Sequence, residues 1–400
     1  MVARRSRETD GSGGGVKIFG QHDEATIQQL KRCAAAERNA PAVLCADGHL
    51  GYSMPIGGVV GYRDHVSPSG VGYDIACGNL AIRTNLPAVD LAPSDYVRIA
   101  NAIQRRISFG MGRHNDDPVR DHPVFDAIAR SPVTEQRRLL ELARDQLGTV
   151  GGGNHYVDVL EDEAGQLWVG IHFGSRGFGH RTATGFLNIA AGRRFEAHSR
   201  QGAEMHAPPA LLPLAAPAGQ DYIAAMTIAG DYAYAGREAV GSTVLDILGA
   251  HETDRVHNHH NFAWNERHGG GDYWVVRKGA TPAFPGQRGF IGGSMDDIAV
   301  IVHGVESAQS AAALYSTVHG AGRVMSRRQA KKVVDFRSVQ DRLRRQGTVL
   351  RGAGADEAPE VYRKLDDVLT PHAATIAIEH TLRPRVVVMA GPHERDPYRD

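Results

Sequence analysis

Glycine divides much of this chain into short apolar runs. It supplies 47 of the 400 residues, more than the usual share of about 7%. Between residues 42 and 84 short apolar runs alternate with glycine-containing turns, which predicts strands joined by tight turns rather than long helices. Further strands are expected at 156–160, 167–173, 273–277, 299–302 and 386–389.

Helix-forming stretches lie between these strands. No repeat of fixed period and no break in composition separates the chain into parts, so we predict a single large α+β domain over residues 16–391, with mixed sheets surrounded by helices. Residues 1–15 are expected to form a flexible lead, 207–219 a loop and 392–400 a tail. Helices are expected at 24–38, 94–108, 124–129, 134–146, 179–197, 221–248, 326–332, 339–345 and 362–369.

The overall charge does not identify a partner. Lys plus Arg and Asp plus Glu each number 45, so any contact with a nucleic acid would have to come from a local patch. The three cysteines, Cys33, Cys45 and Cys77, are too few and too scattered for a disulfide framework, which favours free thiols or metal ligands in a reducing cytoplasm. No secretory leader and no apolar stretch of about 20 residues is present, which argues against secretion and membrane insertion.

Short polar clusters beside glycine carry the chemical information. A thiolate, a carboxylate and several imidazoles can hold Mn²⁺, Zn²⁺ or Fe²⁺, and one bridging thiolate could serve two ions. Backbone N–H groups of glycine-rich turns can bind phosphate oxygens. The clusters are Asp47-Gly48-His49, Asp74-Ile75-Ala76-Cys77, Gly151-Gly152-Gly153-Asn154-His155, His172 within IHFGSRG, His259-His260-Asn261, and His319-Gly320-Ala321-Gly322-Arg323.

Each cluster taken alone also has an ordinary structural explanation. Asp74 and Cys77 are compatible with a turn aspartate beside a buried thiol, and His172 with a hydrogen-bonded histidine at a strand end. Most histidines of the run from His251 to His268 are expected to be solvated or hydrogen-bonded to neighbours. Cys33 and Cys45 are expected to be buried apolar residues. A solvated helix face is the ordinary explanation for the basic run Arg323, Arg327, Arg328, Lys331 and Lys332.

The clusters occur together and in an order that resembles the RtcB RNA ligases. DGHLG at 47–51 with MPIGG at 54–58, VGYDIACG at 71–78 and GTVGGGNH at 148–155 are each similar to a motif of that family. The later motifs IHFGSRG, HHN and HGAGR follow in the same order, so the resemblance spans most of the chain.

The resemblance implies two Mn²⁺ ions, one held by Asp74, Cys77 and His155 and the other by Cys77, His172 and His260. It implies that His319 attacks the α-phosphate of GTP and becomes a histidine–GMP phosphoramidate. Arg176 and Arg323, each beside a glycine-rich turn, are candidates to bind phosphates of RNA or nucleotide. The implied nucleotide contacts are Asn154, Asp158, His260, Asn261, Gly293, Ser294, Met295, Gly320, Ala321 and Gly322.

The implied reaction joins an RNA 3′-phosphate or 2′,3′-cyclic phosphate to a 5′-hydroxyl, as in tRNA splicing and RNA repair, with archease as a possible partner protein. The sequence departs from the family at three places: Asp158 replaces a glutamate, Met389-Ala390-Gly391 stands where a Lys-Gly terminus is usual, and Ala299 replaces a serine. Three alternatives stay open. They are a guanylyl capping enzyme for RNA or DNA 3′-phosphates, a dinuclear metal phosphohydrolase, and a non-enzymatic metal- or RNA-binding protein.

Overall fold

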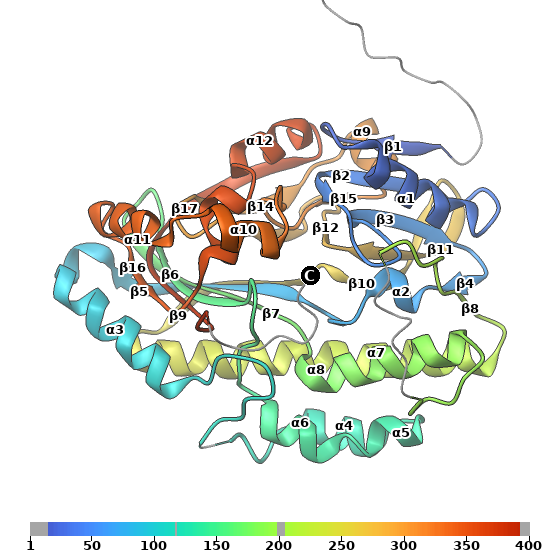
Figure 1. The fold of residues 1–400 in the computed structure, drawn as a ribbon, viewed down its shortest axis with the longest axis horizontal. Coiled ribbons are helices and arrows are strands. Elements are labelled where there is room, and N and C mark those ends of the chain that lie inside the picture. The colour runs from blue at the N-terminus through green and yellow to red at the C-terminus, as the bar shows by residue number, and fades with distance from the viewer. Residues whose placement is uncertain (1–14, 117, 198–204, 393–400) are drawn as a thin grey trace, which may run out of the picture.

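A computed structural model describes residues 15–116, 118–197 and 205–392. These residues form mixed β-sheets surrounded by helices, which confirms the predicted α+β class (Figure 1). The lead predicted for 1–15 and the tail predicted for 392–400 lie almost wholly outside the described residues. The domain limits at 16 and 391 stay a prediction.

The larger sheet has eight strands in the order β13-β14-β17-β6-β7-β5-β9, with β16 paired to β17. Strand β7, inside this sheet, is mostly apolar and is buried along nearly its whole length, as expected where both faces of a sheet are covered. The bounds are β5 Gly78–Pro87, β6 Tyr156–Glu161, β7 Gln166–Phe173, β9 Glu252–His259, β13 Arg288–Ile291, β14 Ala299–Gly304, β16 Val349–Arg351 and β17 Ile376–Met389.

The smaller sheet has five strands in the order β1-β2-β3-β11-β10, and two short ribbons accompany it. The glycine-rich segment 42–84 contains three strands of the two sheets, as predicted. The bounds are β1 Val16–Ile18, β2 Ala42–His49, β3 Ile56–Tyr62, β10 Asn261–His268 and β11 Gly271–Lys278, with ribbons β4 His65–Val66 to β8 Leu212–Pro213 and β12 Ala280–Pro282 to β15 Ser316–Val318.

A single residue, His260, links a strand of the larger sheet to a strand of the smaller one. Strand β9 of the larger sheet ends at His259, and β10 of the smaller sheet begins at Asn261. The His260 N–H donates to the Cys77 carbonyl at 2.8 Å, one residue before β5 begins. The junction therefore brings a histidine and a cysteine together between the sheets.

Helices cover the sheets on the outside. Figure 1 shows α7 and α8 side by side along one face, with α4, α5 and α6 beyond them. Helix α8 begins with Pro217 in its first turn and ends at Gly249, a left-handed residue, as helix limits often do. The bounds are α1 Glu24–Ala35, α2 Pro68–Val71, α3 Pro93–Arg106, α4 Pro123–Ala129, α5 Thr134–Arg137, α6 Leu140–Gln146, α7 Arg176–Ala190, α8 Pro217–Leu248, α9 Ala308–Ala312, α10 Arg327–Val333, α11 Phe336–Arg345 and α12 Leu365–Leu369.

Several predicted boundaries were wrong. The helix expected at 134–146 is two helices, α5 and α6, because the chain turns at Arg138 and Leu139. The helix expected at 179–197 begins at Arg176 and ends at Ala190, the one expected at 362–369 is only Leu365–Leu369, and the loop expected at 207–219 contains β8 and the start of α8. Strands β9 and β10 were missed because their many polar side chains hide the alternation of a strand.

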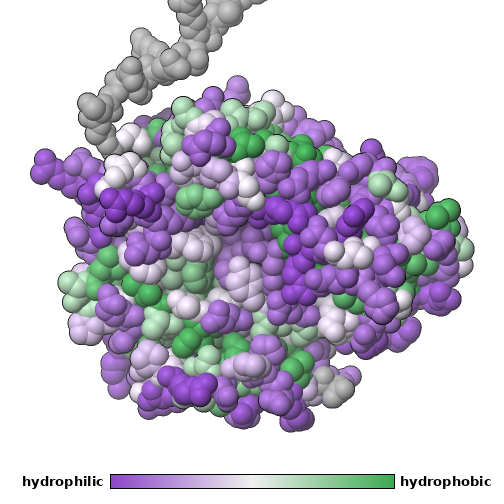
Figure 2. Space-filling model, turned by 180° about the vertical axis from the view of Figure 1, so that it is seen from behind, coloured by the Kyte–Doolittle hydropathy of each residue, from purple (hydrophilic) through white to green (hydrophobic). Residues whose placement is uncertain are grey.

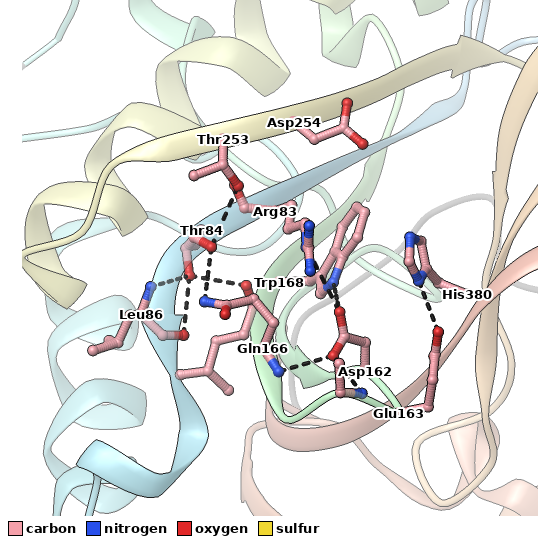
Figure 3. A network of polar contacts seen from close by, with 12 residues as sticks. Arg83, Thr84, Leu86, Asp162, Glu163, Gln166, Trp168, Thr253, Asp254 and His380 are labelled. Atoms are coloured by element: carbon pink, nitrogen blue, oxygen red, sulfur yellow. Dashed lines mark hydrogen bonds and ion pairs between the residues drawn. The ribbon is translucent and has the colours of Figure 1, made fainter.

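A buried aspartate closes the hairpin between β6 and β7 at the far end of the larger sheet (Figure 3). Asp162 accepts hydrogen bonds from the N–H groups of Ala164 and Gln166 and from the Trp168 indole at 2.9 Å. It also pairs with Arg83 of β5 at 3.7 Å. This network ties β5 to the hairpin and fixes the register in which the functional side chains at the other end of these strands meet.

Figure 2 shows a mostly hydrophilic face on which hydrophobic side chains form small separate groups. Large apolar side chains that are exposed are few among the described residues: Val89, Val97, Val324, Val333 and Ile378. None of the described helices combines the length and apolar character that crossing a membrane requires. The distinctive feature is instead a cavity between the sheets.

Candidate functional site

A cavity of about 810 Å³ lies where the two sheets meet. Every residue that the sequence proposed for a site lines its wall, although these residues come from segments more than 200 positions apart. Asp74 and Cys77 stand on the turn before β5, His155 precedes β6, and His172 lies on β7. His260 joins the sheets and His319 follows β15.

Asp74, Cys77 and His155 form one group whose ligand atoms all lie within 4.8 Å of one another. The Nε2 atom of His155 lies 3.1 Å from Asp74 Oδ2 and 3.7 Å from Cys77 Sγ. Burial acts to raise the pKa of Asp74, but the hydrogen bond and charge of His155 outweigh it, so that the pKa is lowered. The carboxyl group is therefore ionised, as a metal ligand must be.

Cys77, His172 and His260 form a second group of the same size, and all three are buried. The Nε2 atom of His172 lies 3.7 Å from Cys77 Sγ. Its Nδ1–H donates to Asn79 Oδ1 at 2.6 Å, which leaves the Nε2 lone pair for a cation. Cys77 belongs to both groups and is placed to bridge two ions.

The donors in these groups fit transition-metal ions. Burial raises the pKa of the Cys77 thiol well above its ordinary value, and Asp74 raises it further, so a thiolate here requires a neighbouring cation. Burial lowers the pKa of His172 and of His260 well below the ordinary value, so both rings are neutral. A thiolate, a carboxylate and neutral imidazoles are a donor set for Mn²⁺, Fe²⁺ or Zn²⁺.

Glycine and one strained residue allow the ligands to approach. A Cβ atom at Gly174 would collide with the Asp74 carboxylate, and one at Gly151 would collide with the His155 ring. Ala76, between the two ligands of the Asp74–Cys77 turn, has φ 59° in the left-handed region. That conformation costs roughly 1–2 kcal/mol for a residue with a Cβ, and strain of this kind often marks a functional site.

His319 has a carboxylate partner. Its Nδ1–H donates to Asp47 Oδ2 at 2.6 Å, and its backbone N–H donates to the same oxygen at 3.0 Å. Asp47 is fully buried; burial acts to raise its pKa, but the charge and hydrogen bonds of His319 lower it. The His319 ring lies 4.9 Å from the His260 ring, so its free Nε2 belongs to the same cavity as the metal-ligand groups.

The other half of the cavity is shaped to receive a ligand with a polar edge. Its wall includes the Gly293-Ser294-Met295 turn and the Gly320-Ala321-Gly322 loop, with Tyr156, Val387 and Met389 beside Asp158. The Oδ1 atom of Asp158 is buried and has no hydrogen-bond partner among the described residues. Burial raises the pKa of Asp158 well above its ordinary value. A ligand that donates hydrogen bonds would satisfy this carboxyl group.

The arginines of the cavity differ in the partners that hold their guanidinium groups. Arg176 is buried, and its guanidinium donates to Thr149 Oγ1 at 3.1 Å and to the Gly110 carbonyl at 2.7 Å. Arg323 and Arg327 are each paired with Glu357 at the cavity wall. The expectation of a solvated basic face was wrong for Arg327, because this side chain turns inward to that buried carboxylate.

Three polar residues of the site were missed from the sequence. Asp47 was noted beside His49 but was given no role, and its contact with His319 spans 272 positions. Asn79 was hidden in an apolar strand. Lys278 ends strand β11, is buried, and donates to the Tyr52 carbonyl at 2.5 Å. Burial lowers its pKa to about 8; a lysine closing an apolar strand before a glycine was the available signal.

Comparison with known proteins identifies the family of the chain. The family model described as tRNA-splicing ligase RtcB matches residues 29–390. The chain is 32% identical over 379 residues to the RNA-splicing ligase RtcB of Escherichia coli strain K12, which covers 86% of this chain and 88% of that protein. It is 31% identical over 409 residues to the tRNA-splicing ligase RtcB of Pyrobaculum aerophilum, with 82% and 83% covered. The chain therefore belongs to the RtcB family.

Proposed function

We propose that this protein is an RNA ligase that uses GTP and Mn²⁺ to join an RNA 3′-phosphate or 2′,3′-cyclic phosphate to a 5′-hydroxyl. The observation that carries the proposal is the Asp47–His319 pair at 2.6 Å, set beside two groups of metal ligands that share Cys77. A hydrolase that only activates water has no need of a histidine whose second nitrogen is held free by a buried carboxylate.

His319 acts as the nucleophile. Its Nε2 forms a bond to the α-phosphorus of GTP while the bond to pyrophosphate breaks, and Asp47 stabilises the positive charge that develops on the ring. A 2′,3′-cyclic end is first opened by water, which breaks the bond from phosphorus to the 2′-oxygen and leaves a 3′-phosphate. An oxygen of the RNA 3′-phosphate then attacks the α-phosphorus of the histidine–GMP, and the nitrogen–phosphorus bond breaks. The 5′-hydroxyl oxygen finally attacks the 3′-phosphorus, and GMP leaves.

The metal-ligand groups would hold Mn²⁺ through Asp74, Cys77 and His155 and through Cys77, His172 and His260. Ions bound there would neutralise negative charge on the phosphates. The His172 ring is held by Asn79 through Nδ1, the nitrogen that is not the proposed ligand atom, which limits the reorganisation that binding requires.

Asp158 supports the choice of GTP. A carboxylate can accept two hydrogen bonds from the N1–H and N2–H groups of guanine, whereas adenine offers only the donors of N6. The buried, unpartnered Oδ1 of Asp158 suits that role. Met389 lines the cavity but offers no polar group to a base, and Ala299 is buried in β14 and is not among the lining residues. Asp158 is therefore the chief polar contact that we propose for the base.

Arg323 and Arg327 would bind RNA phosphates at the cavity wall, with Glu357 holding them in place until RNA arrives. Arg176 would serve the same phosphates from a fixed position. A cytoplasmic location and an archease partner that accelerates guanylylation belong to the same proposal.

A joining assay tests the proposal. One RNA strand carries a labelled 5′ end and a 3′-phosphate, and the second carries a 5′-hydroxyl; GTP is compared with ATP, and Mn²⁺ with Mg²⁺. We expect a joined product only with GTP and Mn²⁺, and none when the second strand has a 5′-phosphate.

Other products would identify the alternatives. A strand with a 3′-terminal guanylyl group that is never joined would indicate a capping enzyme, and loss of the 3′-phosphate without nucleotide would indicate a phosphohydrolase. His251, an exposed histidine outside the cavity, supplies the matched control: His251→Ala should join RNA normally, and His319→Ala should not.

A further inference from the structure

Arg237 lies near the middle of helix α8 and is fully buried. Its guanidinium makes four hydrogen bonds, and these go to backbone carbonyls and imidazoles rather than to a carboxylate. A buried cation costs considerable free energy unless its donors are satisfied. The groups that accept hydrogen bonds from this arginine therefore indicate which parts of the chain it holds in place.

Two of the bonds flank metal-ligand residues. Nη1 donates to the Ala76 carbonyl at 3.1 Å, directly before Cys77, and to the Phe173 carbonyl at 2.6 Å, directly after His172. One nitrogen thus joins the turn before β5 to the end of β7. Ala76 is the residue with φ 59°, and its N–H donates to the Asn261 carbonyl at 2.7 Å, so both sides of the strained peptide are held.

The other two bonds reach the third ligand strand. Nη2 lies 3.0 Å from Nδ1 of His259, the residue before His260, and Nε donates to Nε2 of His257 at 2.8 Å. Because a guanidinium has donors but no acceptor, the facing nitrogen of each ring is the acceptor. These contacts give a structural role to His257 and His259, two histidines of the run 251–268 that are in neither ligand group.

Small residues let helix α8 come close enough. A Cβ atom at Gly236 would lie 3.2 Å from the Phe173 ring, and one at Gly230 would lie 2.9 Å from the Phe262 ring. At these two glycines the helix therefore packs against Phe173 and Phe262 with no side chain of its own in between. Arg237 emerges from this contact directly behind the ligands.

We propose that Arg237 is a positioning residue for the metal-ligand groups. It fixes the ends of β5, β7 and β9 relative to one another, so that Cys77 can serve both groups while His172 and His260 face it. The inference rests on the proposed metal-dependent function, since it concerns how the chain prepares that site.

Cobalt(II) provides the test because a thiolate bound to Co²⁺ absorbs in the near ultraviolet and its weaker visible bands report the coordination geometry. The purified full chain is titrated with Co²⁺, and thermal unfolding is measured in parallel. Arg277→Lys is the matched control: Arg277, on β11 of the smaller sheet, is also fully buried, but it bonds Glu266 of β10 and Ser316 and Leu314 at the start of the β15 ribbon.

We expect Arg237→Lys to weaken Co²⁺ binding about 10- to 100-fold and to change the visible bands, in line with the effect of partners that hold metal ligands. Arg277→Lys should lower Tm but bind Co²⁺ as the wild type does. If Arg237→Lys lost only thermal stability and kept the wild-type affinity and spectrum, the positioning role would be wrong. If the wild type itself failed to bind Co²⁺, the proposed metal dependence would be wrong instead.

A milder pair of variants decides the question if Arg237→Lys does not fold. His259→Asn keeps an acceptor close to the position of Nδ1, whereas His259→Leu removes it. We expect His259→Asn to bind Co²⁺ like the wild type and His259→Leu to bind several-fold more weakly. Equal affinity in the two variants would overturn the proposal.

Discussion

His172 and His319 lie in two halves of one cavity, and each ring is held through Nδ1 at 2.6 Å, but the acceptors differ. His172 donates to Asn79, a neutral amide, whereas His319 donates to Asp47, a buried carboxylate. The amide fixes the ring so that Nε2 faces a cation without adding charge. The carboxylate also stabilises positive charge on the ring. The difference supports the proposal that His172 is a metal ligand and His319 the nucleophile.

Both halves contain buried polar atoms that have no hydrogen-bond partner among the described residues. In the half that contains the proposed metal ligands, Asn79 donates onward to the Phe290 carbonyl at 2.7 Å, whereas Nδ1 of His155 and Nδ1 of His260 have no partner. In the other half, the Oδ1 atoms of Asp47 and Asp158 have none. The His172 ring is therefore held before a ligand binds, and the Asp158 carboxyl group is completed only when a hydrogen-bond donor binds.

Replacing the shared ligand should have the largest effect. Cys77→Ala removes a donor from both groups at once, so we expect the thiolate-to-cobalt band to vanish and RNA joining to fall by about 1,000-fold or more. Cys33→Ala is the control, because Cys33 is another buried thiol but lies outside the cavity. Retention of the cobalt band in Cys77→Ala would remove the basis for assigning this half to metal.

Asp47→Asn should affect the other half alone. Asparagine can still accept from Nδ1–H but stabilises less charge, so we expect the guanylylation rate to fall roughly 100-fold with Co²⁺ binding unchanged. Asp162→Asn, a buried aspartate of the distant hairpin network in Figure 3, should lower Tm and leave that rate unchanged. A loss of Co²⁺ binding in Asp47→Asn would show that the two halves are not separate.

The pH dependence of stability in Asp158→Asn tests whether the Asp158 carboxyl group is buried without a partner. Because burial raises its pKa, the folded state holds this proton to higher pH than the unfolded chain does. The stability linked to that proton is present below the ordinary pKa of a carboxyl group and is lost as pH rises through the raised pKa. Without nucleotide, Asp158→Asn should therefore have a higher Tm than the wild type at neutral pH.

The same variant should raise the KM for GTP about tenfold, since a hydrogen bond to a charged group is worth roughly 1.5–3 kcal/mol. Asp158→Glu, which keeps the carboxylate, should retain most of the affinity. An Asp158→Asn variant with the Tm and KM of the wild type would show that the base does not contact this residue.

Much of the site could be predicted because its chemistry is local in the sequence. Asp74 and Cys77 share one turn, and glycines stand beside nearly every ligand for the steric reason that Gly174 and Gly151 now illustrate. The resemblance to a family then connected clusters that spacing alone could not connect. Strands β6 and β7 and the last four residues of β17 were also predictable, since apolar runs leave few alternatives, whereas the more polar part of β17 before residue 386 was missed.

The residues behind the site could not be predicted in the same way. Asp47, Asn79 and Arg237 act through contacts across 272, 93 and up to 161 positions, and nothing in the sequence around each of them indicates a partner. Strand β9 was missed because His257 and His259, which accept hydrogen bonds from Arg237, interrupt its alternation. A polar strand beside a buried guanidinium has no periodic signature.

Labelling of the protein by GTP tests the central claim most directly. The purified protein is incubated with Mn²⁺ and GTP radiolabelled at the α-phosphate, and the wild type is compared with His319→Ala and His251→Ala. We predict label that is labile in acid and stable in alkali on the wild type and on His251→Ala, and none on His319→Ala. Equal labelling of His319→Ala, or no labelling of the wild type with archease and other nucleotides supplied, would contradict the assignment of His319 as the nucleophile.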